Sequence, residues 1–335
     1  DLAELGDDEV VVRVAGCGVC HTDLGFLYDG VRTRHALPLT LGHEIAGTIE
    51  HAGASSGWAP GTMVVVPAVI PCGECDACYN KRGAICAKQI FPGSDDHGGF
   101  ASHVVVPGRG LCRVDPRALD NSEYELADLC VIADAITTPY QAIVNSALRP
   151  GEVAIFVGVG GVGGFGVQIA HALGAHVAAL DVDPVRLSRI ADYGAELTLQ
   201  ADGDARAIRK TLTGWAKEKG YPLTGWKIFE TSGHPQGQEL AWSLLGYDGH
   251  LGIVGFTRDK VTVRLSNLMA FDATARGTWG CLPDHYPAAV DMVLSGEVRL
   301  GPFIERRPMS DIGATFEALR RHQLDRRPVL IPDFD

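Results

Sequence analysis

The sequence lacks any apolar run that approaches the roughly 20 residues needed to cross a bilayer. It also lacks a signal-peptide pattern at its start, an internal repeat and a low-complexity tail. Basic residues are few, because 29 Lys and Arg stand against 41 Asp and Glu and leave a formal net charge of −12. That charge disfavours nonspecific binding to nucleic acid and to anionic membranes, since both are negative themselves. We therefore expect a cytoplasmic protein without a nucleic-acid or membrane partner.

Apolar residues and glycine are plentiful by contrast. With 335 residues, of which 46% are hydrophobic, the chain can bury a substantial core and is long enough for two domains. Its 41 glycines indicate many tight turns and close backbone approaches. The chain starts at Asp1 with little sequence before its first predicted strand, so we expect that an N-terminal segment has been lost.

The pattern of apolar residues changes along the chain. Between residues 9 and 107 it consists of short β-branched runs separated by Gly and Pro, which is typical of an irregular β domain. After Asp128, apolar strands alternate with helical stretches, which predicts a parallel sheet covered by crossover helices. Beyond Cys281 the chain returns to elements that would complete the first domain, so the parallel sheet is an insertion. The six strands predicted for this sheet are 153–157, 176–181, 196–199, 226–230, 250–254 and 273–278.

A glycine-rich loop follows the first strand of the predicted parallel sheet. The loop contains Gly158, Gly160, Gly161, Val162 and Gly163. Glycines at this spacing permit a tight turn, a close approach of the backbone to a pyrophosphate and close packing of helix on strand. A glycine-rich turn alone is weak evidence, but here an apolar strand, the loop and an amphipathic helix follow in the required order. We therefore predict a dinucleotide-binding site.

An acidic residue is expected about 20 positions further on, at the end of the next strand, where it hydrogen-bonds a ribose. Asp181 stands there. Its carboxylate would repel the 2′-phosphate of NADP, so NAD is the predicted cofactor. Arg186 is either a surface cation or a partner of the adenosine ribose or phosphate, and the spacing leaves both roles open.

Four of the nine cysteines form a C-x2-C-x2-C-x7-C motif, and they are Cys72, Cys75, Cys78 and Cys86. Four thiolates suit a closed tetrahedral zinc that organises a loop with few apolar residues. An iron–sulfur cluster or free thiols are the alternatives. Because no export signal precedes the motif, we expect a reducing compartment and zinc rather than disulfides. The predicted role of this zinc is structural.

A catalytic zinc would need three other protein ligands and one open position for the substrate. The candidates are Cys20, His43 and Asp134, of which the first two lie at the edges of predicted β elements. Taken singly, Cys20 also suits a buried thiol and His43 a hydrogen-bonded core histidine. The residues alone leave this choice open.

Taken together, the motifs resemble the zinc-dependent alcohol dehydrogenase branch of the medium-chain dehydrogenase/reductase superfamily over essentially the whole chain. They are GVCHTD at residues 18–23, GHE at 42–44, the four cysteines, GGFA at 98–101, ITTPY at 136–140 and the loop at 158–163. The resemblance implies an α/β protein with a mostly-β, GroES-like catalytic zinc domain at residues 1–134 and 282–335. It further implies a Rossmann NAD-binding domain at residues 135–281, two zinc ions per chain, and a homo-oligomer joined through the dinucleotide domains.

By the same resemblance, Cys20 and His43 are ligands of the catalytic zinc. Asp134 stands where many relatives have a cysteine as third ligand, and a carboxylate oxygen also ligates zinc; Cys130 is the alternative. Glu44 resembles a residue that supports the zinc site or becomes a transient fourth ligand.

Two neighbours of Cys20 complete the implied site. Asp23 would hydrogen-bond a ligand such as His43 and so orient it. Thr22 would take the first proton from the alcohol. Gly25 replaces the histidine that often passes this proton to solvent, so water, the cofactor ribose, Tyr28 and His35 all remain candidates for its exit.

Residues 17–25, 28–32, 91–99 and 128–140 also resemble members of the family that oxidise a cyclic hydroxyacyl-CoA ester in anaerobic benzoyl-CoA degradation. The implied partner is a small alcohol or ketone, here a cyclic acyl-CoA, and the same zinc could promote water addition to the enone product. Six basic residues are available for CoA phosphates, although most such residues are solvated surface charges. These residues are Arg32, Arg34, Lys81, Arg82, Arg306 and Arg307.

Three other functions remain open at this point. A general secondary-alcohol or polyol dehydrogenase would share the metal site and lack a CoA pocket. A zinc-free enoyl reductase would lack the three catalytic ligands. A non-catalytic protein that binds a partner through its cysteine loop would hold one zinc rather than two.

Overall fold

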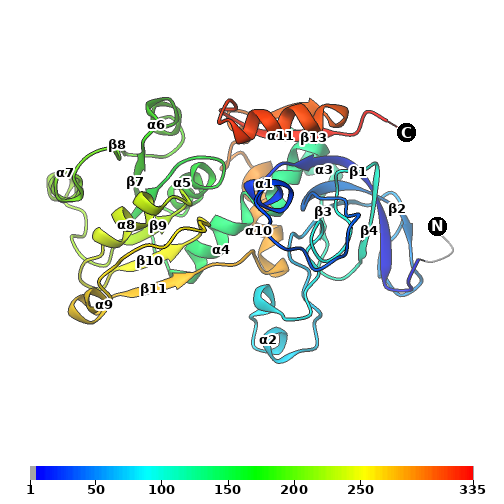
Figure 1. Cartoon of the computed structure of the whole chain (residues 1–335), viewed down its shortest axis with the longest axis horizontal. Coiled ribbons are helices and arrows are strands. Elements are labelled where there is room, and N and C mark those ends of the chain that lie inside the picture. Colours follow the sequence, from blue (N-terminus) through cyan, green and yellow to red (C-terminus); the bar gives the residue numbers. More distant parts are fainter. Residues whose placement is uncertain (1–4, 335) are drawn as a thin grey trace. The chain divides into compact units, whose positions relative to one another are not determined.

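The structure is a computed structural model that describes residues 5–334. Its chain divides into two units (Figure 1). The first consists of Asp1–Thr137, Gly280–Gly296 and Leu300–Asp335, and the second of Thr138–Trp279 and Glu297–Arg299. Among the helices of residues 5–334, none combines the length and apolar character that crossing a bilayer requires.

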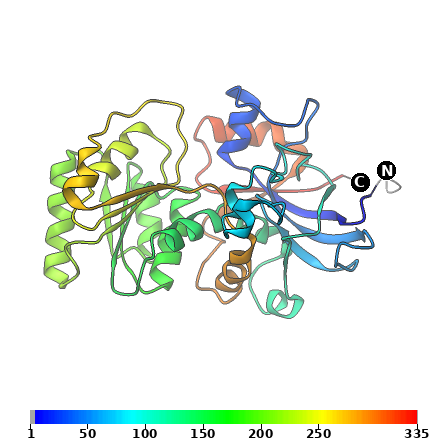
Figure 2. The same cartoon turned by 90° about the horizontal axis from the view of Figure 1, so that it is seen from below.

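The first unit is built on a seven-stranded sheet. The strand order is β12-β13-β1-β2-β3-β5, and β4 pairs with β1 as well. Strands β1 and β2 lie side by side in both views (Figures 1 and 2) and pair antiparallel with irregular register between Val11 and Gly16. The strands are β1 (Glu9–Gly18), β2 (Glu44–Ala52), β3 (Met63–Val66), β4 (His103–Pro107), β5 (Cys112–Arg113), β12 (Ile304–Pro308) and β13 (Arg327–Ile331).

Alternating side chains explain why these segments form a sheet around a core. In β1, Val10, Val12 and Val14 share one face and join the hydrophobic core, whereas Arg13 on the other face is exposed, as the two-residue period of a strand predicts. Val64 and Val66 of β3 and Leu330 of β13 join the same hydrophobic cluster. The C-terminal strand β13 therefore belongs to the core that the N-terminal strands form.

Short helices connect the strands of the first unit. Figure 1 shows the segment around α2, which carries the four-cysteine motif, projecting from this sheet. The helices are α1 (His21–Tyr28), α2 (Asp76–Tyr79), α3 (Pro116–Asp120), α10 (Tyr286–Leu294) and α11 (Ile312–Arg320), with short 3₁₀ segments η2 (Gly83–Ile85), η3 (Leu126–Ala133), η4 (Pro283–His285) and η5 (Met309–Asp311).

The second unit has a six-stranded parallel sheet in the order β11-β10-β9-β6-β7-β8. Counted in chain order, this is the 3-2-1-4-5-6 arrangement of a doubly wound dinucleotide-binding fold. The predicted fold class is thereby confirmed for this part of the chain, with strand ends shifted by no more than a few residues. The strands are β6 (Val153–Val157), β7 (His176–Asp181), β8 (Leu197–Gln200), β9 (Lys227–Glu230), β10 (His250–Ile253) and β11 (Thr274–Gly277).

Helices lie on both faces of this sheet (Figures 1 and 2). All five residues of β6 are buried, as expected of a central parallel strand covered on both sides. Local signals set the helix ends: Asp183 accepts from Val185 N at the start of α6, and Gly220 ends α7 with φ 74°. The helices are α4 (Thr137–Asn145), α5 (Gly163–Ala172), α6 (Pro184–Ala191), α7 (Ala205–Lys219), α8 (Pro235–Ser243) and α9 (Ser266–Phe271).

Candidate active site and cofactor site

The first unit brings Cys20, His43 and Asp134 together. Each offers one potential ligand atom, and these atoms all lie within 4.8 Å of one another. Cys20 Sγ lies 3.7 Å from Asp134 Oδ2, and His43 Nε2 lies 3.6 Å from the same oxygen. One thiol, one imidazole and one carboxylate form a donor set that zinc binds well in catalytic sites. Cys130, the alternative ligand, is buried elsewhere and does not belong to this group.

Three local features place these side chains. Cys20 lies at the start of α1, where Asp23 Oδ2 accepts from Cys20 N at 2.9 Å. His43 directly precedes β2, and Asp134 directly follows η3. The other oxygen of Asp23 lies 3.3 Å from His43 Nδ1, so one fully buried carboxylate contacts two members of the group.

The surroundings of His43 fit a bound cation. Its Nε2 is buried and has no hydrogen-bond partner among residues 5–334, although it points toward the other two candidate ligands. Burial alone would lower the pKa of His43, but Asp23 and Asp134 raise it well above its ordinary value. The carboxylates thus favour positive charge at this point, which a divalent metal ion would supply.

Glu44 is held by Arg327, a residue that the sequence analysis did not single out. Arg327 donates from Nε to Glu44 Oε2 at 2.8 Å and from Nη2 to Oε1 at 2.5 Å, and both side chains are almost fully buried. Ala135 N donates to Glu44 Oε1 at 3.1 Å. Glu44 is therefore not a member of the ligand group here, because its oxygens already have these partners. An Arg at the start of the otherwise apolar run of residues 327–331 is the one sequence signal that could have pointed to this pair.

A glycine makes room for the Glu44 carboxylate. A Cβ placed on Gly18 would lie 2.0 Å from Glu44 Oε2, which no side chain can do without displacing the carboxylate. Burial raises the pKa of Glu44 and Arg327 opposes that rise, which leaves the value at about 7.

Thr22 lies close to the ligand group. Its Oγ1 is 3.6 Å from Cys20 Sγ, and its side chain is only partly buried. Gly25 lies one turn further along α1. Tyr28, a candidate for proton exit, has the Arg320 guanidinium 4.7 Å from its ring centre, and burial with a Glu317 hydrogen bond raises its pKa.

The four-cysteine motif forms a compact group of thiols. Four of the Sγ–Sγ distances range from 3.4 Å for Cys72 and Cys86 to 3.9 Å for Cys72 and Cys78. Zinc–sulfur bonds of about 2.3 Å give a tetrahedron with edges of about 3.8 Å, whereas a disulfide needs about 2.05 Å. The four sulfurs therefore have the spacing of a closed zinc site.

In the second unit, the glycine loop forms the turn that was predicted. Gly158 has φ 91°, and a Cβ on it would lie 2.6 Å from the backbone of Ser232. A Cβ on Gly163, the first residue of α5, would lie 2.0 Å from the Gly158 carbonyl oxygen. Gly160 has only Arg186 nearby, at 3.6 Å, so its surface is open to a ligand. These are the constraints of a pyrophosphate-binding turn.

Asp181 and Arg186 lie next to this loop. Asp181 Oδ2 accepts from Val159 N at 2.7 Å, and its Oδ1 accepts from Asp183 N at 3.0 Å. Arg186 is a partner of both carboxylates, with Nη1 4.0 Å from Asp181 and Nε 3.5 Å from Asp183. The two side chains thus lie where the adenosine ribose of a dinucleotide is expected.

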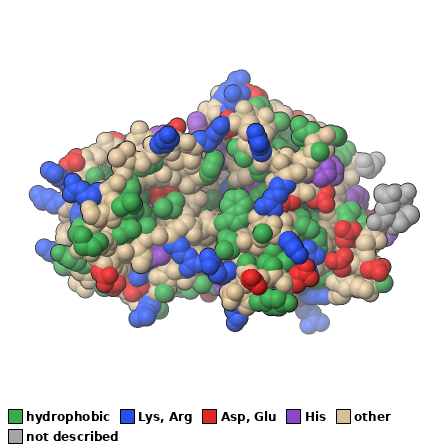
Figure 3. Space-filling view, turned by 60° about the horizontal axis from the view of Figure 1, so that its bottom comes forward, with side chains coloured by type: hydrophobic (Ala, Val, Ile, Leu, Met, Phe, Trp, Pro, Cys, Tyr) green, Lys and Arg blue, Asp and Glu red, His purple; other side chains and the backbone are tan. Residues whose placement is uncertain are grey.

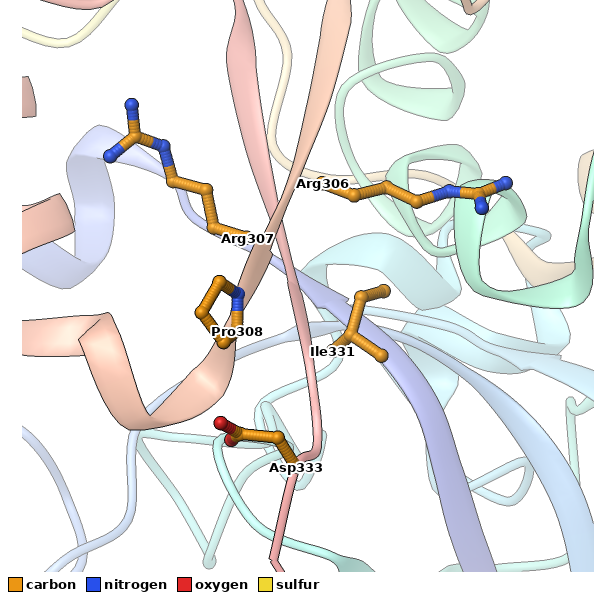
Figure 4. A pocket seen from close by; sticks show the side chains of 5 residues that line it. All are labelled: Arg306, Arg307, Pro308, Ile331 and Asp333. Atoms are coloured by element: carbon orange, nitrogen blue, oxygen red, sulfur yellow. The ribbon is translucent and has the colours of Figure 1, made fainter.

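Basic side chains are dispersed over one face of the protein (Figure 3). Figure 3 shows Lys and Arg interspersed with Asp and Glu on one face, without a continuous basic surface. Figure 4 shows Arg306 and Arg307 on opposite sides of β12, at a surface hollow that Asp333 also lines. Arg306 donates to Asp128 and Glu125 at 2.6 to 2.8 Å, and Arg307 donates to Glu305 at 2.7 Å.

Comparison with known proteins agrees with this geometry. The model of the alcohol dehydrogenase GroES-like domain matches residues 6–116, and that of the zinc-binding dehydrogenases matches residues 161–295. An alcohol dehydrogenase of Geobacillus stearothermophilus is 26% identical over 98% of this chain and 92% of that protein. An L-threonine 3-dehydrogenase of Bacillus velezensis is 26% identical over 99% and 93%.

A solved structure extends the likeness to the whole fold. Galactitol-1-phosphate dehydrogenase from Escherichia coli superposes with a TM-score of 0.86 at 26% identity, over 98% of this chain and 93% of that chain. The expected GroES-like and Rossmann fold class is confirmed, and a non-catalytic zinc-loop protein is excluded. The chain belongs to the zinc-dependent alcohol dehydrogenase family of the medium-chain dehydrogenase/reductase superfamily, and it is an NAD-linked enzyme with two zinc ions per chain.

Proposed function

We propose that this enzyme oxidises the ring hydroxyl of 6-hydroxycyclohex-1-ene-1-carbonyl-CoA with NAD, giving 6-oxocyclohex-1-ene-1-carbonyl-CoA in anaerobic benzoyl-CoA degradation. The observation that carries the alcohol oxidation is the convergence of Cys20, His43 and Asp134 within 4.8 Å. The CoA ester rests on the resemblance of residues 17–25 and 128–140 to enzymes of that reaction. A general secondary-alcohol or polyol dehydrogenase is the alternative.

In this proposal each of the two domains has its own function. Residues 1–134 and 282–335 form the catalytic zinc domain, and residues 135–281 form the NAD-binding domain. The division into two units near Thr137 and Gly280 supports these boundaries to within a few residues.

A cytoplasmic location stays a prediction, with which the nine free cysteines are consistent.

Cys20, His43 and Asp134 would hold the catalytic zinc, and Cys72, Cys75, Cys78 and Cys86 the structural one. A zinc ion held by Cys20, His43 and Asp134 would act as a Lewis acid that lowers the pKa of the substrate hydroxyl. Asp23 orients His43 through Nδ1, which leaves Nε2 free for the metal. Thr22 would receive the hydroxyl proton at Oγ1 while it passes its own hydroxyl proton on to water, the cofactor ribose, Tyr28 or His35. Glu44 would have to exchange its partners before it could act as a transient ligand.

NAD would bind at the loop of residues 158–163, with its pyrophosphate at the N-terminus of α5. The Asp181 carboxylate would accept hydrogen bonds from the ribose hydroxyls and repel a 2′-phosphate. Arg186 would contact the adenosine ribose or phosphate. Among the basic residues considered for CoA phosphates, Arg32, Arg34, Lys81 and Arg82 are exposed, and Arg34 Nε lies 3.5 Å from Asp95. Arg306 and Arg307 are less suitable because of their carboxylate partners.

The second unit also has a surface suited to self-association. Strand β11 is at the edge of its sheet, and all four of its residues are exposed. Leu265 and Met269, beside it in the chain, are exposed as well. An unpaired edge strand is a template for pairing with another copy. We propose a homo-oligomer, a dimer or a tetramer, which light scattering after size-exclusion chromatography would test.

The substrate is tested by following NADH formation with the CoA ester, with simple secondary alcohols and with NADP in place of NAD. Turnover of the CoA ester with NAD supports the proposal, whereas turnover of simple alcohols alone rejects the named substrate and keeps the alcohol dehydrogenase. Mass spectrometry of the products tests the water addition to the enone that we include in the proposal. Failure to find a hydrated product contradicts that second reaction.

Metal content tests the ligand assignment independently of any substrate. We expect two zinc ions per chain, and one after Asp134→Ala or Cys75→Ser. The Asp134→Ala protein should lose the ion that supports activity and keep its stability, whereas Cys75→Ser should loosen the cysteine loop. Two ions in the Asp134→Ala protein would contradict the assignment of Asp134.

A further inference from the structure

The peptide bond between Ala133 and Asp134 is held by two side-chain hydroxyls. Tyr286 Oη donates to the Ala133 carbonyl oxygen at 2.5 Å, and Thr137 Oγ1 donates to the same oxygen at 3.0 Å. Tyr286, Thr137 and Ala133 are all essentially inaccessible to solvent. Both lone pairs of this carbonyl oxygen thus accept a hydrogen bond. The carbonyl belongs to the residue immediately before Asp134, the candidate zinc ligand.

The Tyr286 hydroxyl is itself fixed in direction. Ala68 N donates to it at 3.1 Å, so the oxygen accepts one hydrogen bond and its proton is left for Ala133. The tyrosine is the first residue of α10, and its ring is among the largest fully buried side chains of the protein. The hydroxyl therefore links α10 and the loop after β3 to the peptide that precedes Asp134.

The peptide on the other side of Asp134 is held as well. Ala135 N donates to Glu44 Oε1 at 3.1 Å, and Glu44 is bound by Arg327. The side chain of Asp134 places Oδ2 within 3.7 Å of both Cys20 Sγ and His43 Nε2, and 4.0 Å from Arg327 Nη2. A loop residue with both flanking peptides bonded to buried groups has little freedom to move away from these atoms.

We propose that Tyr286 is a positioning residue for the catalytic zinc, acting through the Ala133 carbonyl to hold Asp134 toward Cys20 and His43. This inference rests on the proposed function, because it takes Asp134 as a zinc ligand. Groups that orient metal ligands without touching the metal contribute substantially to its affinity. Thr137 helps to position Asp134 through its hydrogen bond to the same carbonyl. Glu44, which Arg327 holds, does so through its hydrogen bond with Ala135 N.

The test uses Tyr286→Phe, which removes one oxygen and keeps the buried ring. Competition with a chelator measures the affinity of each of the two ions, and cobalt substitution reports the ligand geometry at the catalytic position through its absorption spectrum. We expect a 10- to 100-fold loss of affinity for one ion, the usual range for removal of such a support, together with a changed cobalt spectrum. The ion of the cysteine loop should keep its affinity and serves as an internal control.

Tyr124→Phe is the matched control. Tyr124 is also buried, and its hydroxyl accepts from Leu300 N at 3.1 Å and donates to Glu123 Oε1 at 2.8 Å, which is a different pair of partners from those of Tyr286. Both ions should keep their wild-type affinities in this variant. If Tyr286→Phe does not fold, Thr137→Val removes the other hydroxyl from the same carbonyl and should weaken the same ion.

A parallel Asp134→Ala protein separates the two hypotheses. If it binds both ions with wild-type affinity, Asp134 is not a ligand, and both the ligand assignment and this inference fail. If it loses one ion while Tyr286→Phe and Thr137→Val retain both affinities and the wild-type cobalt spectrum, the positioning role is overturned and the ligand assignment stands. Equal loss of affinity in Tyr124→Phe and Tyr286→Phe would also overturn the inference.

Discussion

Arg327 and Glu44, 283 positions apart in the chain, form a bidentate ion pair in the interior of the first unit. The carboxylate has no exposed surface and the side chain of Arg327 retains only 5% of its own. Two charges can occupy such a place only when each satisfies the other, because isolated burial of either ion costs several kcal/mol. The pair joins β2 to the C-terminal strand β13, next to the candidate zinc ligands.

Removal of one partner should be far more damaging than removal of both. We expect Arg327→Met to lower the free energy of unfolding by roughly 3–5 kcal/mol, because it leaves the Glu44 carboxylate buried without its partner. Urea unfolding at neutral pH measures this. The double variant Arg327→Met with Glu44→Gln should recover part of the loss, and a double variant no more stable than Arg327→Met would contradict the explanation.

Gly163 should tolerate no side chain. Alanine there would place Cβ 2.0 Å from the Gly158 carbonyl oxygen, so the turn must open and NADH binding, measured by fluorescence, should fall below detection. Gly214→Ala is the control, since Gly214 lies inside α7 with nothing within 4 Å of its Cβ position. That change should raise stability by roughly 0.5–1 kcal/mol and leave binding unchanged. Normal NADH affinity of Gly163→Ala would refute the assignment of this loop.

Asp181 should determine the choice between NAD and NADP. We expect Asp181→Ser to raise the ratio of kcat/KM for NADP to that for NAD by on the order of tenfold, equivalent to about 1.4 kcal/mol of differential binding, because the repulsion of the 2′-phosphate is removed. Some loss of overall activity is also expected, since Val159 N loses its acceptor. Asp192→Asn, which removes an exposed carboxylate from the same unit, should leave the ratio unchanged. An unchanged ratio in Asp181→Ser would assign the preference to other residues.

His250 should make the second unit sensitive to acid. Burial and the nearby Lys227 and Arg276 lower the pKa of His250 to about 4, and its Nδ1 lies 2.9 Å from Thr274 Oγ1. The unfolded chain, with an ordinary histidine pKa of about 6.5, therefore binds more protons between pH 6.5 and 4. The stability that this histidine contributes is complete above about pH 6.5 and is lost as the pH falls toward 4.

His250→Gln should flatten this part of the pH profile, and urea unfolding at several pH values measures it. The expected reduction is on the order of 1–2 kcal/mol between pH 6.5 and 4, because Lys227 is only half-buried and Arg276 is exposed, so solvent and salt screen their contribution. Substitution of the exposed His322 by Gln should leave the slope of this part of the pH profile unchanged. Equal slopes for wild-type and His250→Gln protein would show that other groups cause the acid sensitivity.

Features that depend on short stretches of chain were predictable from the sequence. The cysteine motif is local, because its ligands lie within 15 residues of one another, and loop spacing alone then allows four sulfurs to meet. The same holds for the glycine loop between β6 and α5, where Gly158 and Gly163 leave no room for a Cβ beside the neighbouring backbone. The parallel strands were also predictable, since their apolar runs have no polar face that would suit another arrangement.

Features that join distant segments were decided only by the tertiary structure. Asp134 meets Cys20 across 114 positions, and whether it or Cys130 would do so depended on how η3 packs against β1 and β2. The partnership of Glu44 with Arg327 and the bond from Tyr286 to Ala133 leave no periodic or spacing signal, because each needs a single contact between elements far apart in the chain. Local propensity and spacing determine turns, loops and strand types, whereas the packing of the whole core selects which buried polar groups meet.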